Sequence, residues 1–203
     1  MTVPPPTIQE LPFGFTWVQD EPMARASHAL VADGRVWIVD PVDSPGVVDR
    51  AQGLGDVAAV VQLLDRHNRD CKAIAARLGV PHLTVPDAVP GSPFEVVRVV
   101  HWPKWAENGL WWPAQRALVI PEAVGTAPLF TLGKGPVGVH TMLRPLPPRK
   151  ALGGFAPEHL LVGHGPSVDG DAARDGLRRA LAGARRDLPR LFVELPKALR
   201  SAR

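Results

Sequence analysis

The stretch VVQLLDRHNRDCKAIAARLGV, residues 60–80, carries the first indication of the fold. It begins inside a nearly continuous apolar run, residues 57–64, which has the length of a strand covered on both faces. A polar turn follows, and then a predicted helix that Gly79 ends. The face of this helix expected to be buried consists of Cys71, Ile74, Ala75 and Leu78. Because loops at strand ends often carry function, the turn DRHNRDC is the first place to look for chemistry.

Further elements are predicted on both sides of this stretch. Two apolar runs meet at Asp33-Gly34 within residues 27–43, which indicates a hairpin. A buried strand at residues 160–163 runs into the tight turn GHGPSV, and Asp169 is placed to cap a final helix. Other short strands are predicted in PHLTV, FEVVRVVHW, GLWW, RALVI and PLFTL. The order of elements indicates an α/β fold in which one sheet packs on another with helices outside.

Length and composition are those of an ordinary globular protein. A chain of 203 residues that is 45% hydrophobic and 21% charged can bury one core, so we expect a single domain over residues 1–203, with a loosely held N-terminal segment over residues 1–12. The longest apolar runs are too short for a membrane span, and the first residues resemble no signal peptide. The single cysteine, Cys71, fits a reducing compartment. These features predict a cytoplasmic protein that does not bind membranes.

The basic character of the chain is confined to its C-terminal end. Residues 171–203, a predicted helix and tail, hold nine Lys/Arg and four Asp/Glu, a net charge of +5, whereas the remainder has 14 basic and 16 acidic residues, a net charge of −2. A solvated outer helix face explains this distribution better than a surface for nucleic acid or anionic lipid. Since no nucleic-acid-binding motif is present, we expect no nucleic-acid partner.

Several side chains near predicted strand ends are candidates for chemistry. His164, between two glycines, either reaches a ligand or only hydrogen-bonds the backbone of its turn. Asp70 and Cys71 offer a carboxylate and a thiolate to zinc, but Asp70 would equally suit a helix N-cap and Cys71 the buried helix face. His67 is either in the site or exposed in the turn. GKGPVG (133–138) lacks the spacing of a phosphate-binding loop.

Taken together, these elements resemble the metallo-β-lactamase fold superfamily. SHALVADGRVWIVDPVD (27–43) resembles its opening hairpin. RALVIPEAVG resembles the strand that leads to a metal-bridging carboxylate, with Glu122 in that place, and LLVGHGPSV the late strand that delivers a metal-ligating histidine, here His164. The resemblance covers about residues 15–190 and implies a four-layer αββα sandwich.

The polar turn departs from the HxHxDH metal motif of this family. With the motif laid on residues 66–71, its first two histidines are replaced by Arg66 and Asn68, its aspartate is Asp70 and its last histidine is Cys71. A shift by one residue would give His67 a histidine position but would cost Asp70 its own, so we prefer the unshifted register. The family's middle histidine corresponds at best to His101, without the usual glycine-rich context.

These changes leave at most one of the two metal positions that the resemblance implies. The position that the motif's first two histidines would serve faces the guanidinium of Arg66, which repels a divalent cation and would instead pair with Glu122. The ligands expected at the surviving position are Asp70, Cys71, Glu122 and His164. The residues expected to line the site are Arg66, His67, Asn68 and His101. The expected cofactor is therefore none or a single zinc ion. Four protein ligands would fill the tetrahedral coordination of zinc, whereas three would leave one position for water.

Two functions stay open. The favoured one is a protein with a degraded metal site, not a dinuclear zinc hydrolase, that binds a small molecule or a partner without metal. The alternative is a mononuclear metal-dependent hydrolase of an ester, thioester or amide. The tryptophans of HWPKWAENGLWW either line an apolar pocket, pack in the core or form a homodimer contact; they are Trp102, Trp105, Trp111 and Trp112.

Overall fold

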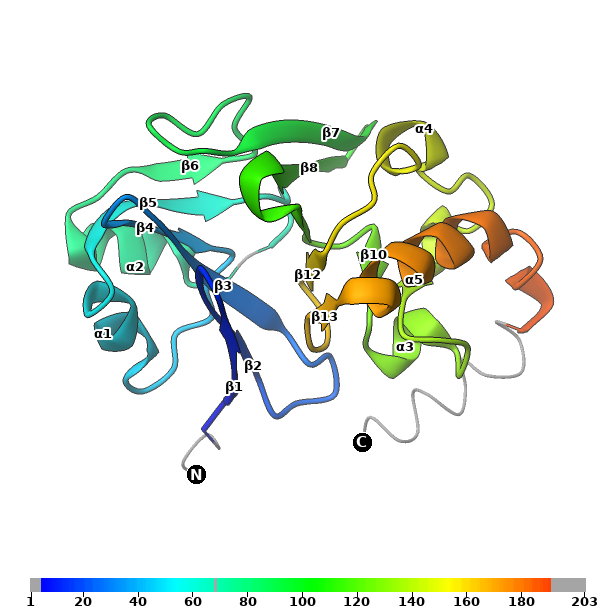
Figure 1. Cartoon of the computed structure of the whole chain (residues 1–203), viewed down its shortest axis with the longest axis horizontal. Coiled ribbons are helices and arrows are strands. Elements are labelled where there is room, and N and C mark those ends of the chain that lie inside the picture. The colour runs from blue at the N-terminus through cyan, green and yellow to red at the C-terminus, as the bar shows by residue number, and fades with distance from the viewer. Residues whose placement is uncertain (1–4, 68, 191–203) are drawn as a thin grey trace.

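Two β-sheets face each other, with helices on their outer sides (Figure 1). The structure, a computed structural model, describes residues 5–67 and 69–190. The first sheet has six strands in sequence order, antiparallel from β1 to β4 and parallel from β4 to β6. Its strands are β1 (Thr7–Leu11), β2 (Gly14–Val18), β3 (Ala26–Ala32), β4 (Arg35–Val39), β5 (Asp56–Gln62) and β6 (His82–Thr84).

The second sheet has five strands in the order β13-β12-β9-β8-β7. Only β9 and β12 are parallel neighbours, and the other pairs are antiparallel. Its strands are β7 (Glu95–Trp102), β8 (Trp105–Trp112), β9 (Ala117–Ile120), β12 (His159–Val162) and β13 (Val168–Asp169). A separate two-stranded ribbon consists of β10 (Val124–Gly125) and β11 (Gly138–Val139).

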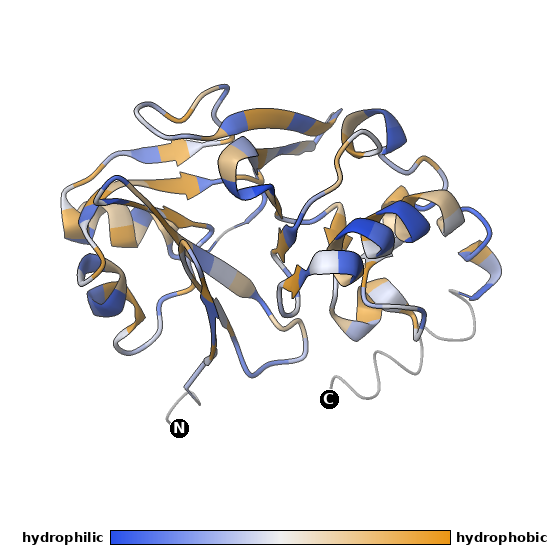
Figure 2. Ribbon diagram, in the orientation of Figure 1, coloured by the Kyte–Doolittle hydropathy of each residue, from blue (hydrophilic) through white to orange (hydrophobic). Residues whose placement is uncertain are grey.

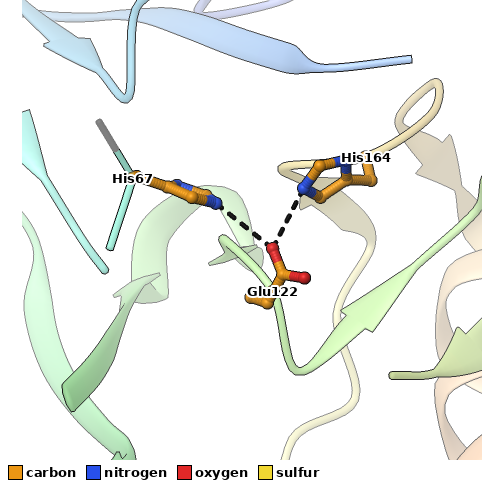
Figure 3. Close-up of side chains that lie close together, drawn as sticks. All are labelled: His67, Glu122 and His164. Atoms are coloured by element: carbon orange, nitrogen blue, oxygen red, sulfur yellow. Dashed lines mark hydrogen bonds and ion pairs between the residues drawn. The ribbon is translucent and has the colours of Figure 1, made fainter. Parts of the chain in front are cut away.

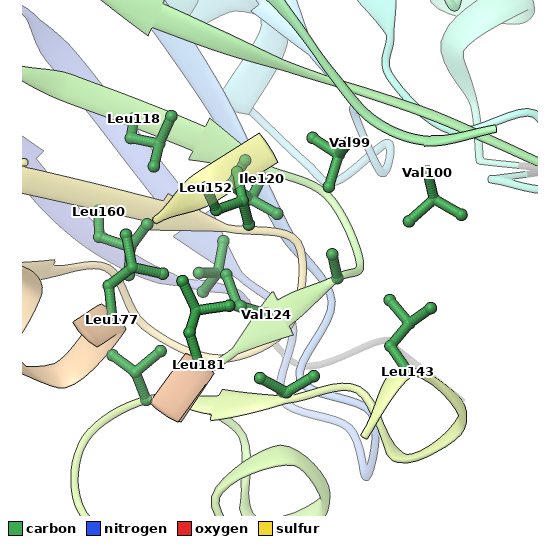
Figure 4. Packing of buried hydrophobic residues seen from close by; sticks show 14 of the residues in the cluster. Val99, Val100, Leu118, Ile120, Val124, Leu143, Leu152, Leu160, Leu177 and Leu181 are labelled. Carbon is green, nitrogen blue, oxygen red and sulfur yellow. The ribbon is translucent and has the colours of Figure 1, made fainter. Parts of the chain in front are cut away.

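Three hydrophobic clusters separate four layers. One cluster packs α1 and α2 on the first sheet, a second lies between the sheets, and a third packs α4 and α5 on the second sheet (Figure 4). The helical segments are α1 (Val47–Gln52), α2 (Cys71–Leu78), η1 (Pro113–Gln115), α3 (Pro128–Thr131), η2 (Thr141–Leu143), α4 (Arg149–Leu152) and α5 (Gly170–Gly183). The predicted αββα sandwich is therefore confirmed.

Alternation along the strands explains why the sheets can be covered on both faces. In β4, Val36 and Ile38 face the α1–α2 layer, whereas Trp37 and Val39 face the second sheet. Successive side chains of a strand point to opposite faces, so an apolar residue at every position gives each face its own hydrophobic surface. In Figure 2, β5 and β7 accordingly show long orange stretches, whereas α5 turns blue stretches toward the viewer.

Most predicted elements are present. Asp33 and Gly34, both with positive φ (49° and 72°), form the two-residue loop between β3 and β4, and Gly79 (φ 67°) follows α2. The stretch PLFTL, predicted as a strand, is instead the one-turn helix α3, which Pro128 starts at its first position. The N-terminal segment is not loose throughout, because residues 7–11 form the edge strand β1.

The C-terminal helix α5 ends at Gly183, and the last part of the predicted basic tail, residues 191–203, lies outside the described residues. Within the described residues, no helix has the length and hydropathy needed to cross a membrane.

Candidate metal centre

The candidate site lies where four strands end. β4 and β5 are parallel neighbours in the first sheet, and β9 and β12 are parallel neighbours in the second. Parallel strands end at the same edge of their sheet, and side chains in the loops beyond that edge can converge on one point. The residues delivered by the segments after these strands are Asp40, His67, Glu122 and His164.

The imidazole rings of His67 and His164 both point at the same carboxylate oxygen of Glu122 (Figure 3). Nε2 of His67 lies 3.2 Å, and Nε2 of His164 3.0 Å, from Oε2 of Glu122. The three donor atoms lie within 4.8 Å of one another. Side chains of His67, Glu122 and His164 are only 8%, 12% and 6% exposed, so water screens their charges weakly.

The other nitrogen of each ring indicates which tautomer is present. Nδ1 of His164 lies 2.8 Å from the carbonyl oxygen of Met23, which can only accept, so Nδ1 carries the hydrogen. Nδ1 of His67 faces Oδ2 of the buried Asp40 at 3.4 Å, and among the described residues it makes no regular hydrogen bond. A ring nitrogen that faces a carboxylate is also expected to carry the hydrogen. Both Nε2 lone pairs then point at the Glu122 oxygen, and three electron-pair donors so arranged need a cation among them.

His140 holds the other oxygen of the same carboxylate. Its Nε2 lies 3.2 Å from Oε1 of Glu122, while its Nδ1 accepts the backbone N–H of Met142 at 3.2 Å. Since Nδ1 accepts, the hydrogen is on Nε2, and His140 donates it to Glu122. His140 therefore orients the carboxylate and is not itself placed to offer a lone pair to the site.

A fully buried glutamate supports the backbone around Glu122. Oε1 of Glu107 accepts the N–H groups of Glu122 (3.2 Å) and Ala123 (2.8 Å), and Oε2 accepts the indole N–H of Trp105 (3.0 Å). Burial raises the pKa of Glu107 to about 7, against the lowering effect of these bonds. The turn that presents Glu122 is thus fixed through its own backbone.

The pKa shifts reflect the same demand for positive charge. Burial tends to raise the pKa of Glu122, but hydrogen bonds donated by His140 and, when their rings are protonated, by His164 and His67 outweigh it and hold the pKa far below the usual range. Burial and Arg69 tend to lower the pKa of His67, yet Asp40 and Glu122 raise it overall. The carboxylate is therefore ionised at neutral pH, and His67 takes up a proton readily when no other cation is near.

Arg69 provides a fixed positive charge beside the site. Its guanidinium donates to three backbone carbonyls at strand ends, those of Ala26, Asp40 (2.9 Å) and Gly163 (2.8 Å). These bonds tie the ends of three strands from the two sheets together. Arg69 was not among the candidate residues, because an arginine in a polar turn has no sequence feature that distinguishes it from a solvated one.

The structure places two of the four expected ligands elsewhere. Oδ2 of Asp70 accepts the backbone N–H of Asp43 at 2.8 Å, and Asp70 occupies the N-cap position of α2 without a capping side-chain bond. Cys71 is 1% exposed and packs against the first sheet, where burial raises the pKa of its thiol and keeps it protonated. Glu122 and His164 do come together, and His67 joins them in place of Asp70 and Cys71.

Two expected lining residues also lie away from Glu122. The guanidinium of Arg66 lies over the Trp105 ring, 4.4 Å from its centroid, and donates to the carbonyl of Lys104, so it does not pair with Glu122 as expected. Nε2 of His101 bonds Oδ1 of Asn108 at 2.9 Å on the exposed side of β7. Asn68 lies outside the described residues.

The tryptophan cluster divides between core and surface. Trp112 packs on Phe13 and Phe94 between the sheets. Trp105 is buried against His140, with ring centroids 5.1 Å apart, and Trp102 is 43% exposed. Only Trp105 contacts a residue of the candidate site, so core packing explains most of the cluster.

His140, which contacts Glu122 directly, is another site residue that sequence reasoning missed. It directly follows the short strand β11, as His164 follows β12 by two residues. Residues 138–139, however, form a strand of only two residues, which is too short for a periodic signal.

Comparison with known proteins identifies the fold. No family model and no curated protein matches the sequence. The structure is similar to a metallo-β-lactamase from Pontibacter korlensis (TM-score 0.62, 12% identity, 91% of this chain and 99% of that chain). It is also similar to the DIM-1 metallo-β-lactamase exposed to ceftazidime (TM-score 0.61, 13% identity, 91% and 100%) and to VMB-1 at pH 5.5 (TM-score 0.58, 10% identity, 89% and 98%). The chain therefore has the metallo-β-lactamase fold.

Proposed function

We propose that His67, Glu122 and His164 hold one divalent metal ion and that the chain is a mononuclear metal-dependent hydrolase. The types of ligand indicate that this ion is zinc. The observation that supports this most is the convergence of two imidazole Nε2 atoms and one carboxylate oxygen within 4.8 Å. The donor set suits zinc, since imidazole and carboxylate are both common zinc ligands. Three protein ligands also leave a coordination position open, which is the arrangement of catalytic zinc sites.

The surrounding residues suit such an ion. Nδ1–H groups directed at the Met23 carbonyl and the Asp40 carboxylate fix the histidine rings with their Nε2 atoms toward Glu122. His140 occupies the second oxygen of Glu122, so that one carboxylate oxygen remains for a cation. Zinc, when bound, would supply a Lewis acid that lowers the pKa of water toward neutrality. The substrate class we propose is an ester, thioester or amide.

The proposal covers one metal position and not two. In the register preferred from the sequence, Arg66 and Asn68 take the places of the motif's first two histidines, and neither is a good zinc ligand. The fixed charge of Arg69 beside the site further disfavours a second divalent ion. A degenerate motif that keeps a single metal position accounts both for the convergence of His67, Glu122 and His164 and for the lack of ligands for a second metal ion.

Two exposed methionines adjoin the site through their backbones. The Met23 carbonyl accepts the Nδ1–H of His164, the Met142 N–H donates to His140, and the two residues are 42% and 65% exposed. Flexible thioether side chains adapt to irregular apolar surfaces. We therefore include an apolar acyl or leaving group in the proposed substrate.

Metal content tests the proposal directly. Tag-free protein purified without chelators would be analysed by plasma mass spectrometry before and after exposure to excess zinc. We expect about one tightly bound metal per chain, its loss in His67→Asn and His164→Asn, and its retention in His101→Asn, whose imidazole lies on β7. A hydrolase screen with p-nitrophenyl esters and thioesters would follow on loaded protein.

The opposite result has a definite meaning. If neither sample of the wild-type protein retains metal, the proposal fails. The same three residues would then be joined by protons on His67 and His164, and the function expected would be metal-free binding of a small molecule or partner.

A further inference from the structure

A second site is suggested by a cavity of about 360 Å³ between α5 and the segment that connects α3 to β11. One wall is helix α5, including Gly176 and Gly183, and the other includes residues 134–139. A Cβ on Gly176 would approach a side-chain carbon of Val137 to 2.8 Å, so the absence of a side chain there lets helix and segment come close. None of the residues proposed to bind metal lines this cavity.

The charges that line the cavity are mostly positive. Lys134, Arg144, Arg179 and Arg186 are opposed by the single carboxylate of Asp187. Oδ1 of Asp187 already pairs with Nζ of Lys134 at 2.5 Å, and its Oδ2 lies 4.0 Å from Nη1 of Arg144. One carboxylate thus faces two cations before the two remaining arginines are considered.

Among the residues that the structure describes, Arg179 is neutralised only in part and Arg186 not at all. Arg179 lies 3.7 Å from Asp175, which also receives Arg178 at 2.9 Å. Arg186 is exposed and has no ion pair with any residue in 5–67 or 69–190. Like charges that gather in a concave wall raise the local concentration of anions.

Arg144 distinguishes this cavity from an ordinary basic surface. Its side chain is 3% exposed, and its guanidinium donates to the carbonyls of Val139 (3.1 Å) and Phe130. A buried guanidinium is costly unless an anion is near, and the Asp187 oxygen at 4.0 Å is beyond hydrogen-bond range. A ligand that brings negative charge would complete this environment.

We propose that this cavity binds a small phosphate-bearing anion. Its volume suits a small ligand, and arginine forks match the oxygens of a phosphoryl group better than they match a single point charge. Arg144 forms the buried inner wall, and Lys134, Arg179 and Arg186 form the exposed rim. This proposal does not depend on the metal proposed at Glu122.

Isothermal titration calorimetry of the full chain tests the proposal, with inorganic pyrophosphate as the probe and ionic strength held constant with chloride. We expect saturable binding of one pyrophosphate per chain. The double variant Arg179→Ala/Arg186→Ala should bind at least tenfold more weakly, because each arginine contributes a charge-assisted bond. Arg178→Ala, on the same helix but outside the cavity, is the matched control and should bind as the wild type does.

A metal-centre variant separates this site from the proposed metal site, to which pyrophosphate could also bind. His164→Asn should retain pyrophosphate binding if the cavity is the site. Binding that is lost in His164→Asn but kept in the double variant would overturn the proposal, as would the absence of saturable binding. Equal weakening by Arg178→Ala would also overturn it, because the attraction would then be general to the helix. Acetate at the same concentration should not compete, and full competition by acetate would refute the choice of a phosphoryl ligand.

Discussion

The contact between His140 and Glu122 gives the sharpest prediction about the candidate metal centre. Its Nε2–H donates to Oε1 of Glu122 over 3.2 Å, and the Met142 N–H fixes the tautomer. Replacing His140 by leucine keeps an apolar side chain of similar size against Trp105 and Phe130, whose ring centroids lie 5.1 and 5.6 Å from the imidazole, but removes the donor. The carboxylate would then lose its orientation while the packing around it is largely kept.

The size of the effect follows from the bond that is lost. A hydrogen bond to a charged group contributes about 1.5–3 kcal/mol. This one is long, and Glu122 is 12% exposed, so the lower end of that range applies. About 1.5 kcal/mol corresponds to roughly tenfold weaker zinc binding, within the range of about 10–100-fold found for partners that orient metal ligands.

Competition against a chromogenic zinc chelator at pH 7.5 would measure the change. His140→Gln should recover zinc affinity to within roughly threefold, because its amide can donate near the position of Nε2. His101→Leu, on the exposed side of β7, should leave the affinity unchanged. Zinc binding by His140→Leu as tight as that of the wild type would refute the role given to His140, and failure of glutamine to rescue would assign the loss to packing.

Three further predictions concern residues around the site. Burial lowers the pKa of His28 to about 3, so below about pH 6.5 the unfolded chain binds a proton at His28 that the folded chain does not. As the pH is lowered below about 6.5, this group therefore reduces the free energy of unfolding by up to about 1.4 kcal/mol per pH unit. Urea unfolding at pH 7 and pH 5 should therefore show a smaller loss in His28→Asn than in the wild type, and equal losses would contradict this. Cys71→Ala should keep its full zinc content, and native Cys71 should resist alkylation until urea is added; loss of zinc would restore Cys71 as a ligand. Arg69→Lys should lower the free energy of unfolding by about 3 kcal/mol, since a single lysine nitrogen does not span carbonyls that the guanidinium fork reaches and would lose two of the three charged bonds at about 1.5 kcal/mol each; a loss below about 1 kcal/mol would argue against this tie.

The fold could be predicted from sequence because its signals are local. Asp33-Gly34 specifies a two-residue hairpin loop by backbone conformation alone, and the apolar run at residues 57–64 specifies a strand with two covered faces. The prediction of a strand in PLFTL was wrong because residues 129–132 suit a strand and a single helical turn equally, and Pro128 at the first position favours the helix.

The candidate site could be predicted only in part, because its geometry depends on contacts between distant segments. Glu122 and His164 follow recognisable strands, so their placement was accessible. Which residue of the turn joins them depends on how the chain leaves β5, and the preferred register favoured Asp70 and Cys71 over His67.

The charges around Glu122 argue for one cation position. Its Oε1 is occupied by the N–H of His140, so the remaining demand is at Oε2, where two histidine lone pairs converge. With neutral histidines, the two carboxylates of Glu122 and Asp40 and the guanidinium of Arg69 have a net charge of −1. Two protons or one divalent ion would change this net charge to +1. Arg69 cannot move to meet the demand, because its guanidinium is held by backbone carbonyls from two sheets. An arginine fixed in this way takes the role of a structural cation, and the single position beside Oε2 is the one at which the proposed metal would compete with protons.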